Sequence, residues 1–181
     1  MAARKKVLGI LGNIRTDSSN ERLLRYIGAI NAHAIDLHIF KQLADIPHFN
    51  PEHDNESVPA VVTDFRKLIT DADGVIICTP EYVFSIPGSL KNALEWVVST
   101  TVFTDKPLGL ITASASGQKG HEQLQLIMQT LGGKFSHDTL LLISGIKGKI
   151  GADGAITDAE TDLQIRQFSE NFLKNMNEMP Q

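Results

Sequence analysis

The sequence predicts an α/β fold, with a doubly wound sheet of five parallel strands and helices on both faces. The first reason is the order of elements: five apolar runs alternate with five segments of helical periodicity, which requires parallel strands joined by helical crossovers. The second is that several runs are apolar throughout, as in strands buried on both faces. The third is the length of 181 residues, enough for one domain with a sizeable core. We therefore expect residues 1–181 to form a single domain.

The first part of the chain predicts a strand, a helix and a second strand. The run KKVLGILG at residues 5–12 reads as a buried strand, residues 18–31 carry apolar side chains at helical spacing, and residues 34–40 alternate apolar and polar side chains. The polar stretch at residues 41–57 shows no period and contains two prolines. We expect it to be a long loop without secondary structure, and such loops are often functional or disordered.

The remaining elements follow the same alternation. A helix that begins near residue 58 ends at Asp73-Gly74, and the strand GVIICT follows it. Strands are also predicted at residues 107–114 and 138–144. The three other helices show apolar stripes: Leu90, Ala93, Leu94, Val97 and Val98 in the first; Leu124, Ile127, Met128 and Leu131 in the second, closed by Gly132-Gly133; and Ile165, Phe168 and Phe172 in the third, capped by Thr157 or Asp158.

Composition limits the classes of function that the chain can have. The chain has 17 Lys and Arg against 21 Asp and Glu, a net charge of −4, which lacks the basic excess of a nucleic-acid-binding protein. No apolar run approaches membrane-spanning length, and the basic start MAARKK is not followed by the apolar segment of a signal peptide. The single cysteine, Cys78, excludes an internal disulfide, and its apolar strand favours a packing role. We expect a cytoplasmic protein without nucleic-acid or membrane partners.

The site is expected at the carboxyl ends of the strands, where open α/β sheets bind ligands. The loops there are GNIRTDSSN at residues 12–20, TPEYVFSIPG at 79–88 and SASGQKG at 114–120. In the first, Arg15, Ser18 and Asn20 at a helix start suit an anion, although Ser18 or Ser19 alone could be a simple N-cap. The chain has neither GxGxxG nor a Walker A pattern. These features together favour a mononucleotide phosphate, such as that of FMN in flavodoxin-like folds.

Two of these loops carry a resemblance to a known family. The chain resembles the NADPH-dependent FMN reductases, a flavodoxin-like family that includes quinone, azo-dye and chromate reductases. One family motif reads approximately Gly-Ser-(Leu/Ile)-Arg-x-x-Ser-x-Asn, and this chain has GNIRTDSSN. The other reads approximately Pro-Glu-Tyr-Asn-x-Ser-x-Pro-Gly-x-Leu-Lys-Asn-Ala-(Ile/Leu)-(Asp/Glu)-Trp, and this chain has PEYVFSIPGSLKNALEW at residues 80–96. The chain departs from the family at Asn13, where Ser is usual, and at Val83, where Asn is usual.

The resemblance implies residue roles and cofactors. The implied cofactors are FMN and NADPH or NADH, with a nicotinamide and a small-molecule electron acceptor as the partners. The implied FMN-binding residues are, for the phosphate, Asn13, Arg15, Ser18, Ser19 and Asn20; along the flavin, through backbone groups, Pro80, Glu81, Tyr82 and Val83; and beside the ring, Ser114, Ala115, Ser116 and Gly117. No side chain need act as an acid or base, since the cofactor carries the chemistry.

Several features keep alternatives open. Trp96 lies off the apolar stripe of its helix, so we expect it on the surface or in an interface, and the resemblance favours a homodimer or homotetramer. The resemblance suggests that the loop with His48, Phe49 and His53 could reach a partner's active site, and its two histidines lack a third residue for a metal site. Ser114 and Ser116 with downstream histidines suggest a hydrolase, but ASASG is not a G-x-S-x-G elbow. A flavin-binding electron carrier or a non-catalytic module on the same fold remains the other alternative.

Overall fold

The computed structural model describes residues 3–55 and 57–178, so the first two residues of the basic N-terminal stretch lie outside it. One sheet of five strands has the order β2-β1-β3-β4-β5. All four neighbouring strand pairs are parallel. The strands are β1 (Lys5–Leu11), β2 (Ile35–Phe40), β3 (Gly74–Thr79), β4 (Leu108–Ser114) and β5 (Leu140–Ser144). This is the predicted doubly wound topology, with the chain crossing from one half of the sheet to the other between β2 and β3.

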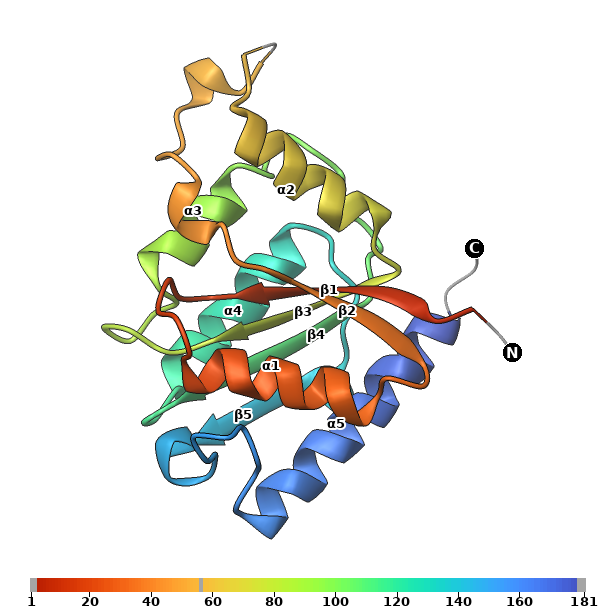
Figure 1. Cartoon of the computed structure of the whole chain (residues 1–181). Coiled ribbons are helices and arrows are strands. Elements are labelled where there is room, and N and C mark those ends of the chain that lie inside the picture. The colour runs from red at the N-terminus through yellow and green to blue at the C-terminus, as the bar shows by residue number, and fades with distance from the viewer. Residues whose placement is uncertain (1–2, 56, 179–181) are drawn as a thin grey trace.

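Helices cover both faces of the sheet (Figure 1). They are α1 (Ser19–Ile30), α2 (Ala60–Asp71), α3 (Gly88–Glu95), α4 (Gln118–Thr130) and α5 (Ala159–Glu178). One apolar cluster joins α2, α3 and α4 to the sheet, and a second joins α1 and α5 to the opposite face. In the described residues, no helix combines the length and apolarity needed to cross a bilayer.

The central strand explains why the sheet needs both layers. All six residues of β3 are buried. Val75 and Ile77 belong to the cluster under α2–α4, whereas Ile76 and Cys78 belong to the cluster under α1 and α5. Because successive side chains of a strand point to opposite faces, a continuous apolar run requires cover on both sides.

Most predicted helix ends are confirmed in the structure. Ser18, rather than Ser19, is the N-cap of α1, since its Oγ accepts a hydrogen bond from Glu21 N at 3.2 Å. Asp158, rather than Thr157, caps α5, and its carboxylate accepts from Thr161 N at 2.9 Å. At the end of α4, Gly132 has φ of +80°, the left-handed conformation that closes many helices.

The stretch at residues 41–57 is more ordered than the sequence predicts. It contains two short 3₁₀ helices, Leu43–Asp45 and Pro51–His53. Arg66 on α2 fixes it, with Nη2 2.7 Å from Asp54 Oδ1. The Arg66 Nε also donates to Trp96 O at 2.8 Å. The expectation of a loop without secondary structure was therefore wrong, because tertiary contacts order a segment that lacks a sequence period.

Trp96 was also predicted wrongly. Its side chain is 0% exposed. Its Nε1 donates to Pro47 O at 2.7 Å, and the ring of Phe49 packs edge-on with the centroids 5.2 Å apart. Helical spacing misled the prediction because α3 ends at Glu95. For the same reason Val98, placed on the apolar stripe, is 62% exposed.

Candidate active site

The three expected loops meet at one edge of the sheet because β1, β3 and β4 are parallel neighbours. Gly12 N donates to Cys78 O at 2.8 Å, which joins the start of the first loop to the end of β3. A Cβ on Gly12 would lie 2.0 Å from Thr79 Oγ1. Only glycine therefore permits this approach of the two strand ends, and the first and second loops leave the sheet side by side.

The first loop, residues 13–18, wraps the start of α1. Asn13 is buried, and its Oδ1 accepts from Arg15 N at 3.0 Å. Asp17 has φ of +51°, and its N–H donates to Glu21 Oε2 at 3.0 Å. Since the first turn of a helix leaves N–H groups without intrahelical partners, this end of α1 can receive an anion.

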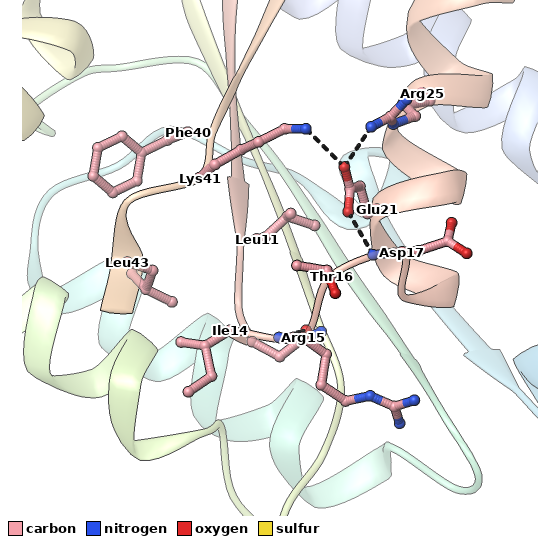
Figure 2. Close-up of a pocket in the computed structure, with 11 residues that line it drawn as sticks. Leu11, Ile14, Arg15, Thr16, Asp17, Glu21, Arg25, Phe40, Lys41 and Leu43 are labelled. Atoms are coloured by element: carbon pink, nitrogen blue, oxygen red, sulfur yellow. Dashed lines mark hydrogen bonds and ion pairs between the residues drawn. The ribbon is translucent and has the colours of Figure 1, made fainter. Parts of the chain in front are cut away.

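Arg15 differs from the other cations around this loop. Arg25 Nη2 and Lys41 Nζ both bind Glu21 Oε1, at 2.6 and 3.0 Å, and the hydrogen bond from Arg25 holds the pKa of the Glu21 carboxyl below its usual value. Arg15 is exposed and forms no ion pair with any described residue. Figure 2 shows its guanidinium directed away from Glu21 and out of the loop. Arg15 is therefore the cation here that is available to an external anion.

Asn20 is placed differently from the simple expectation of a side-chain donor to an anion. Its side chain is buried, with Nδ2 donating to Ala113 O at 3.2 Å and Oδ1 accepting from the Cys78 thiol at 3.2 Å. The amide thus ties α1 to β3 and β4. Burial raises the pKa of the Cys78 thiol, which favours the packing role predicted for it because the thiolate is the reactive form.

The second loop lies between the other two and is held in place by hydrogen bonds. Pro80 is buried, and Glu81 is fixed to the start of α4, where its Oε2 accepts from Gly120 N at 2.8 Å. Tyr82 and Ser85 exchange two backbone hydrogen bonds, of 2.8 and 3.0 Å, around Val83 and Phe84. The exposed side of the loop carries Tyr82 and this turn.

The third loop joins β4 to α4. The Ser114 hydroxyl donates to Glu81 O at 3.4 Å, and the Ser144 hydroxyl donates to Ser116 O at 2.8 Å. Ala115 and Ser116 are exposed, and Gly117 has φ of +94°. The loop is therefore held at both sides while its tip faces solvent beside the second loop.

This arrangement does not support the hydrolase alternative. The Ser114 hydroxyl is directed to a backbone oxygen. The ring of His121 instead pairs with Thr112, with Nδ1 and Oγ1 2.9 Å apart, and the His137 side chain is 99% exposed. A serine hydrolase needs a histidine within hydrogen-bond reach of its nucleophile.

The sequence did not identify the network of Glu21, Arg25 and Lys41 behind the first loop. The network lines a cavity of about 320 Å³ together with Arg15 and the end of β2. The spacing of Ser18 and Glu21 matches the S-x-x-E capping box and could have drawn attention to Glu21. In a capping box the Glu21 carboxylate would accept from Ser18 N, but here its Oε2 accepts from Asp17 N, which only the folded loop brings into range.

The donor set fits a phosphate monoester with a flat group attached. The exposed Arg15 guanidinium and the N-terminus of α1 supply charge and N–H donors. The half-exposed Tyr82 and the backbone of the second loop supply a surface beside them.

Comparison with known proteins identifies the family. The family model described as NADPH-dependent FMN reductase matches residues 5–144. The chain belongs to this family. A quinone reductase of Escherichia coli K12 is 34% identical over 130 residues, covering 69% of this chain and 68% of that protein. A 2-hydroxy-1,4-benzoquinone reductase of a Burkholderia species is 28% identical over 174 residues, covering 92% and 93%.

A solved structure supports the fold of this FMN reductase family member. The flavoenzyme NAD(P)H:(acceptor) oxidoreductase FerB of Paracoccus denitrificans superposes with a TM-score of 0.79 over 96% of this chain and 97% of that chain, at 24% identity. The flavodoxin-like fold predicted from the sequence is confirmed. Membership in the family makes the chain an NAD(P)H-dependent oxidoreductase with FMN as its cofactor.

Proposed function

We propose that this reductase passes two electrons from NADPH or NADH to a quinone, an azo compound, a free flavin or a metal oxyanion. The observation that carries the proposal is Arg15, an exposed guanidinium without an ion pair in the described residues, at the N-terminus of α1 in the loop that matches the family motif. The names of the relatives above favour a quinone among these acceptors. Bound FMN would supply the electron-transfer chemistry itself.

The protein's own residues would bind and position. Arg15, Ser18, Ser19 and the backbone N–H groups of the first turn of α1 would hold the phosphate, with Asn13 shaping the loop from within. Asn20 would act as a positioning residue, because its amide fastens this turn to Ala113 O in β4. The residues that would lie along the flavin are Pro80, Glu81, Tyr82 and Val83, with Ser114, Ala115, Ser116 and Gly117 at its other side.

Oligomerisation and location complete the proposal. We propose that residues 1–181 act as one cytoplasmic FMN-binding domain that pairs into a homodimer. An apolar groove between α3 and α4, about 470 Å³ in volume, includes the exposed Val98 and Leu126. Lys91 and Glu95 stand at this groove and pair with each other within the chain at 2.5 Å, so a two-fold pairing can bring two such ion pairs together. Sedimentation of Leu126→Glu tests the interface: a monomer supports it, whereas an unchanged dimer contradicts it.

A spectroscopic titration tests the function. The purified protein should bind FMN, show the yellow flavin absorption and lose it when NADPH or NADH is added without oxygen. A colourless protein that neither takes up FMN nor oxidises either nucleotide would contradict the proposal.

A charge variant tests the phosphate role of Arg15. Hydrogen bonds to charged groups contribute about 1.5–3 kcal/mol, so Arg15→Ala should weaken FMN binding about 10- to 150-fold. Lys67→Ala is the matched control, because Lys67 is an exposed cation on α2, paired with Asp71 at the end of that helix. Equal FMN affinity of Arg15→Ala and the control would exclude Arg15 from the phosphate site.

A further inference from the structure

The turn at the tip of the second loop has a backbone shape that suits other residues. Tyr82 N donates to Ser85 O at 2.8 Å and Ser85 N donates to Tyr82 O at 3.0 Å, which leaves a two-residue turn between them. Val83 has φ of +51° and Phe84 has φ of +57°. Positive φ at both central positions is typical of a type I′ hairpin turn, which Asn-Gly favours strongly.

This conformation is unfavourable for the residues that adopt it. The left-handed region costs about 1–2 kcal/mol per residue, and it is rarest for β-branched and bulky side chains such as Val83 and Phe84. Their side chains are 95% and 73% exposed, so packing within the chain does not offset the cost. Strain of this kind persists where the surroundings determine the backbone, and it is often found at functional sites.

The surroundings do determine this backbone. Glu81, before the turn, is held by Gly120 N on α4 and by the Ser114 hydroxyl. Ser85, after the turn, donates from its hydroxyl to Gln123 Oε1 on α4 at 2.5 Å. These hydrogen bonds fix both ends of the turn, so the side chains of Val83 and Phe84 point away from the sheet.

That place is the middle of the carboxyl edge. β3 lies between β1 and β4, and the loop that follows it projects beyond the sheet (Figure 1). Two further apolar side chains at this edge are exposed: Ile14 in the first loop, at 62%, and Tyr82, at 46%. Large exposed apolar residues are therefore concentrated where the ligand loops meet, apart from those of the groove between α3 and α4.

The side chains at the tip of the turn offer nothing to a small anion. Neither Val83 nor Phe84 has a side-chain donor, so only backbone N–H groups could bind an anion there, and those of Tyr82 and Ser85 are used to close the turn. A flat apolar molecule would bury both side chains against itself, and that burial is favourable. A small oxyanion would have to be desolvated beside these apolar side chains, whose atoms could not replace its hydrogen bonds to water.

We propose that the side chains of Val83 and Phe84 form the wall of the acceptor site and make the reductase prefer alkyl- or aryl-substituted quinones to small metal oxyanions. The inference rests on the function proposed above and narrows its acceptor class. The overall reaction is NAD(P)H + H⁺ + quinone → NAD(P)⁺ + hydroquinone, in which the nicotinamide loses two electrons and the quinone gains two electrons and two protons.

The test replaces the two residues with those that the turn favours. The double variant Val83→Asn/Phe84→Gly keeps the turn, relieves the strain and removes the apolar wall. Leu163→Gln is the matched control, because Leu163 is an exposed apolar residue on α5, 55% accessible. Three properties are measured: the melting temperature without FMN, the affinity for FMN, and kcat/KM with a prenylated naphthoquinone and with chromate.

The expected result separates the acceptors. The double variant should melt at a higher temperature than the parent and bind FMN at least as well. Its kcat/KM for the prenylated quinone should fall about 10- to 200-fold, as expected for a lost apolar contact in a binding pocket. Most of this fall should come from a higher KM. The kcat/KM for chromate should fall by a smaller factor or rise. The control should change neither value.

Two other results would overturn the inference and leave the proposed function intact. If kcat/KM falls equally for both acceptors, the turn acts through FMN or the fold; if neither falls, it does not contact the acceptor. Failure of the parent protein itself to bind FMN or oxidise NAD(P)H would instead contradict the proposed function.

Discussion

Substitution of Gly12 by alanine should disturb both the sheet and the ligand site. A Cβ at this position would lie 2.0 Å from Thr79 Oγ1, 2.3 Å from Thr79 Cβ and 2.8 Å from Thr79 Cα. Rotation of the threonine side chain can remove only the first of these overlaps. Because the last involves backbone, the ends of β1 and β3 must move apart, and the hydrogen bond from Gly12 N to Cys78 O must lengthen.

The size of the effect follows from these contacts. Overpacking a well-packed region costs about 1–3 kcal/mol, and the backbone overlap places Gly12→Ala near the upper limit. For a chain of this size a loss of about 3 kcal/mol lowers the melting temperature by about 6–12 °C. The first and second loops leave the sheet at this point, so FMN affinity should fall as well.

Thermal unfolding followed by circular dichroism, without FMN, measures the loss. Gly88→Ala is the control, since a Cβ there would meet nothing within 4 Å among the described residues outside its own helix turn, and it should stabilise slightly. In a double-mutant cycle, Thr79→Gly should recover part of the loss in Gly12→Ala, whereas Thr79→Ala should recover little because its Cβ remains. If Gly12→Ala has the same melting temperature as the parent protein, the close approach of the two strand ends does not require glycine at this position.

Three further outcomes are expected. Arg66→Ala should destabilise the protein by about 1–3 kcal/mol, because the Asp54 carboxylate and Trp96 O both lose the Arg66 guanidinium as a donor; equal stability by urea denaturation would contradict this. Trp96→Phe should lose about 0.5–1.5 kcal/mol, since Pro47 O loses one of its two donors and keeps Asn92 Nδ2 at 2.9 Å, and urea denaturation checks it with Phe103→Leu as a size-only comparison. Burial lowers the pKa of His121 in the folded protein, so as the pH falls below about 6.5 the histidine is protonated first in the unfolded state. The free energy of unfolding should therefore decrease as the pH falls through this range, and it should decrease less in His121→Gln.

The architecture and the location of the site were accessible from the sequence. The run GVIICT could be a strand only if both faces were covered, and the strict alternation of elements left a parallel sheet as its arrangement. The loops after β1, β3 and β4 then had to meet at one edge. These conclusions depend on periodicity and order, which are properties of the chain taken one segment at a time.

Individual side chains in the site were less accessible. Asn20 was expected to face an anion, and its amide instead joins α1 to β4. Glu21 was not considered, yet its carboxylate pairs with Arg25 and Lys41 and accepts a hydrogen bond from Asp17 N. Partners so far apart in sequence leave no local pattern, because the contact exists only after the strands have paired.

The sequence by itself determined the layers, the parallel sheet and the two motifs that place the chain in its family. Tertiary structure alone decided that Trp96 is covered by the segment that seemed unstructured, and that Arg15, unlike Arg25 and Lys41 beside it, has no ion pair among the described residues. It also decided that Val83 and Phe84 stand exposed in a left-handed turn. The physical reason is that apolar periodicity reports which face of an element is buried. The partners of a polar group and the backbone angles of a loop are set by elements that lie far away along the chain.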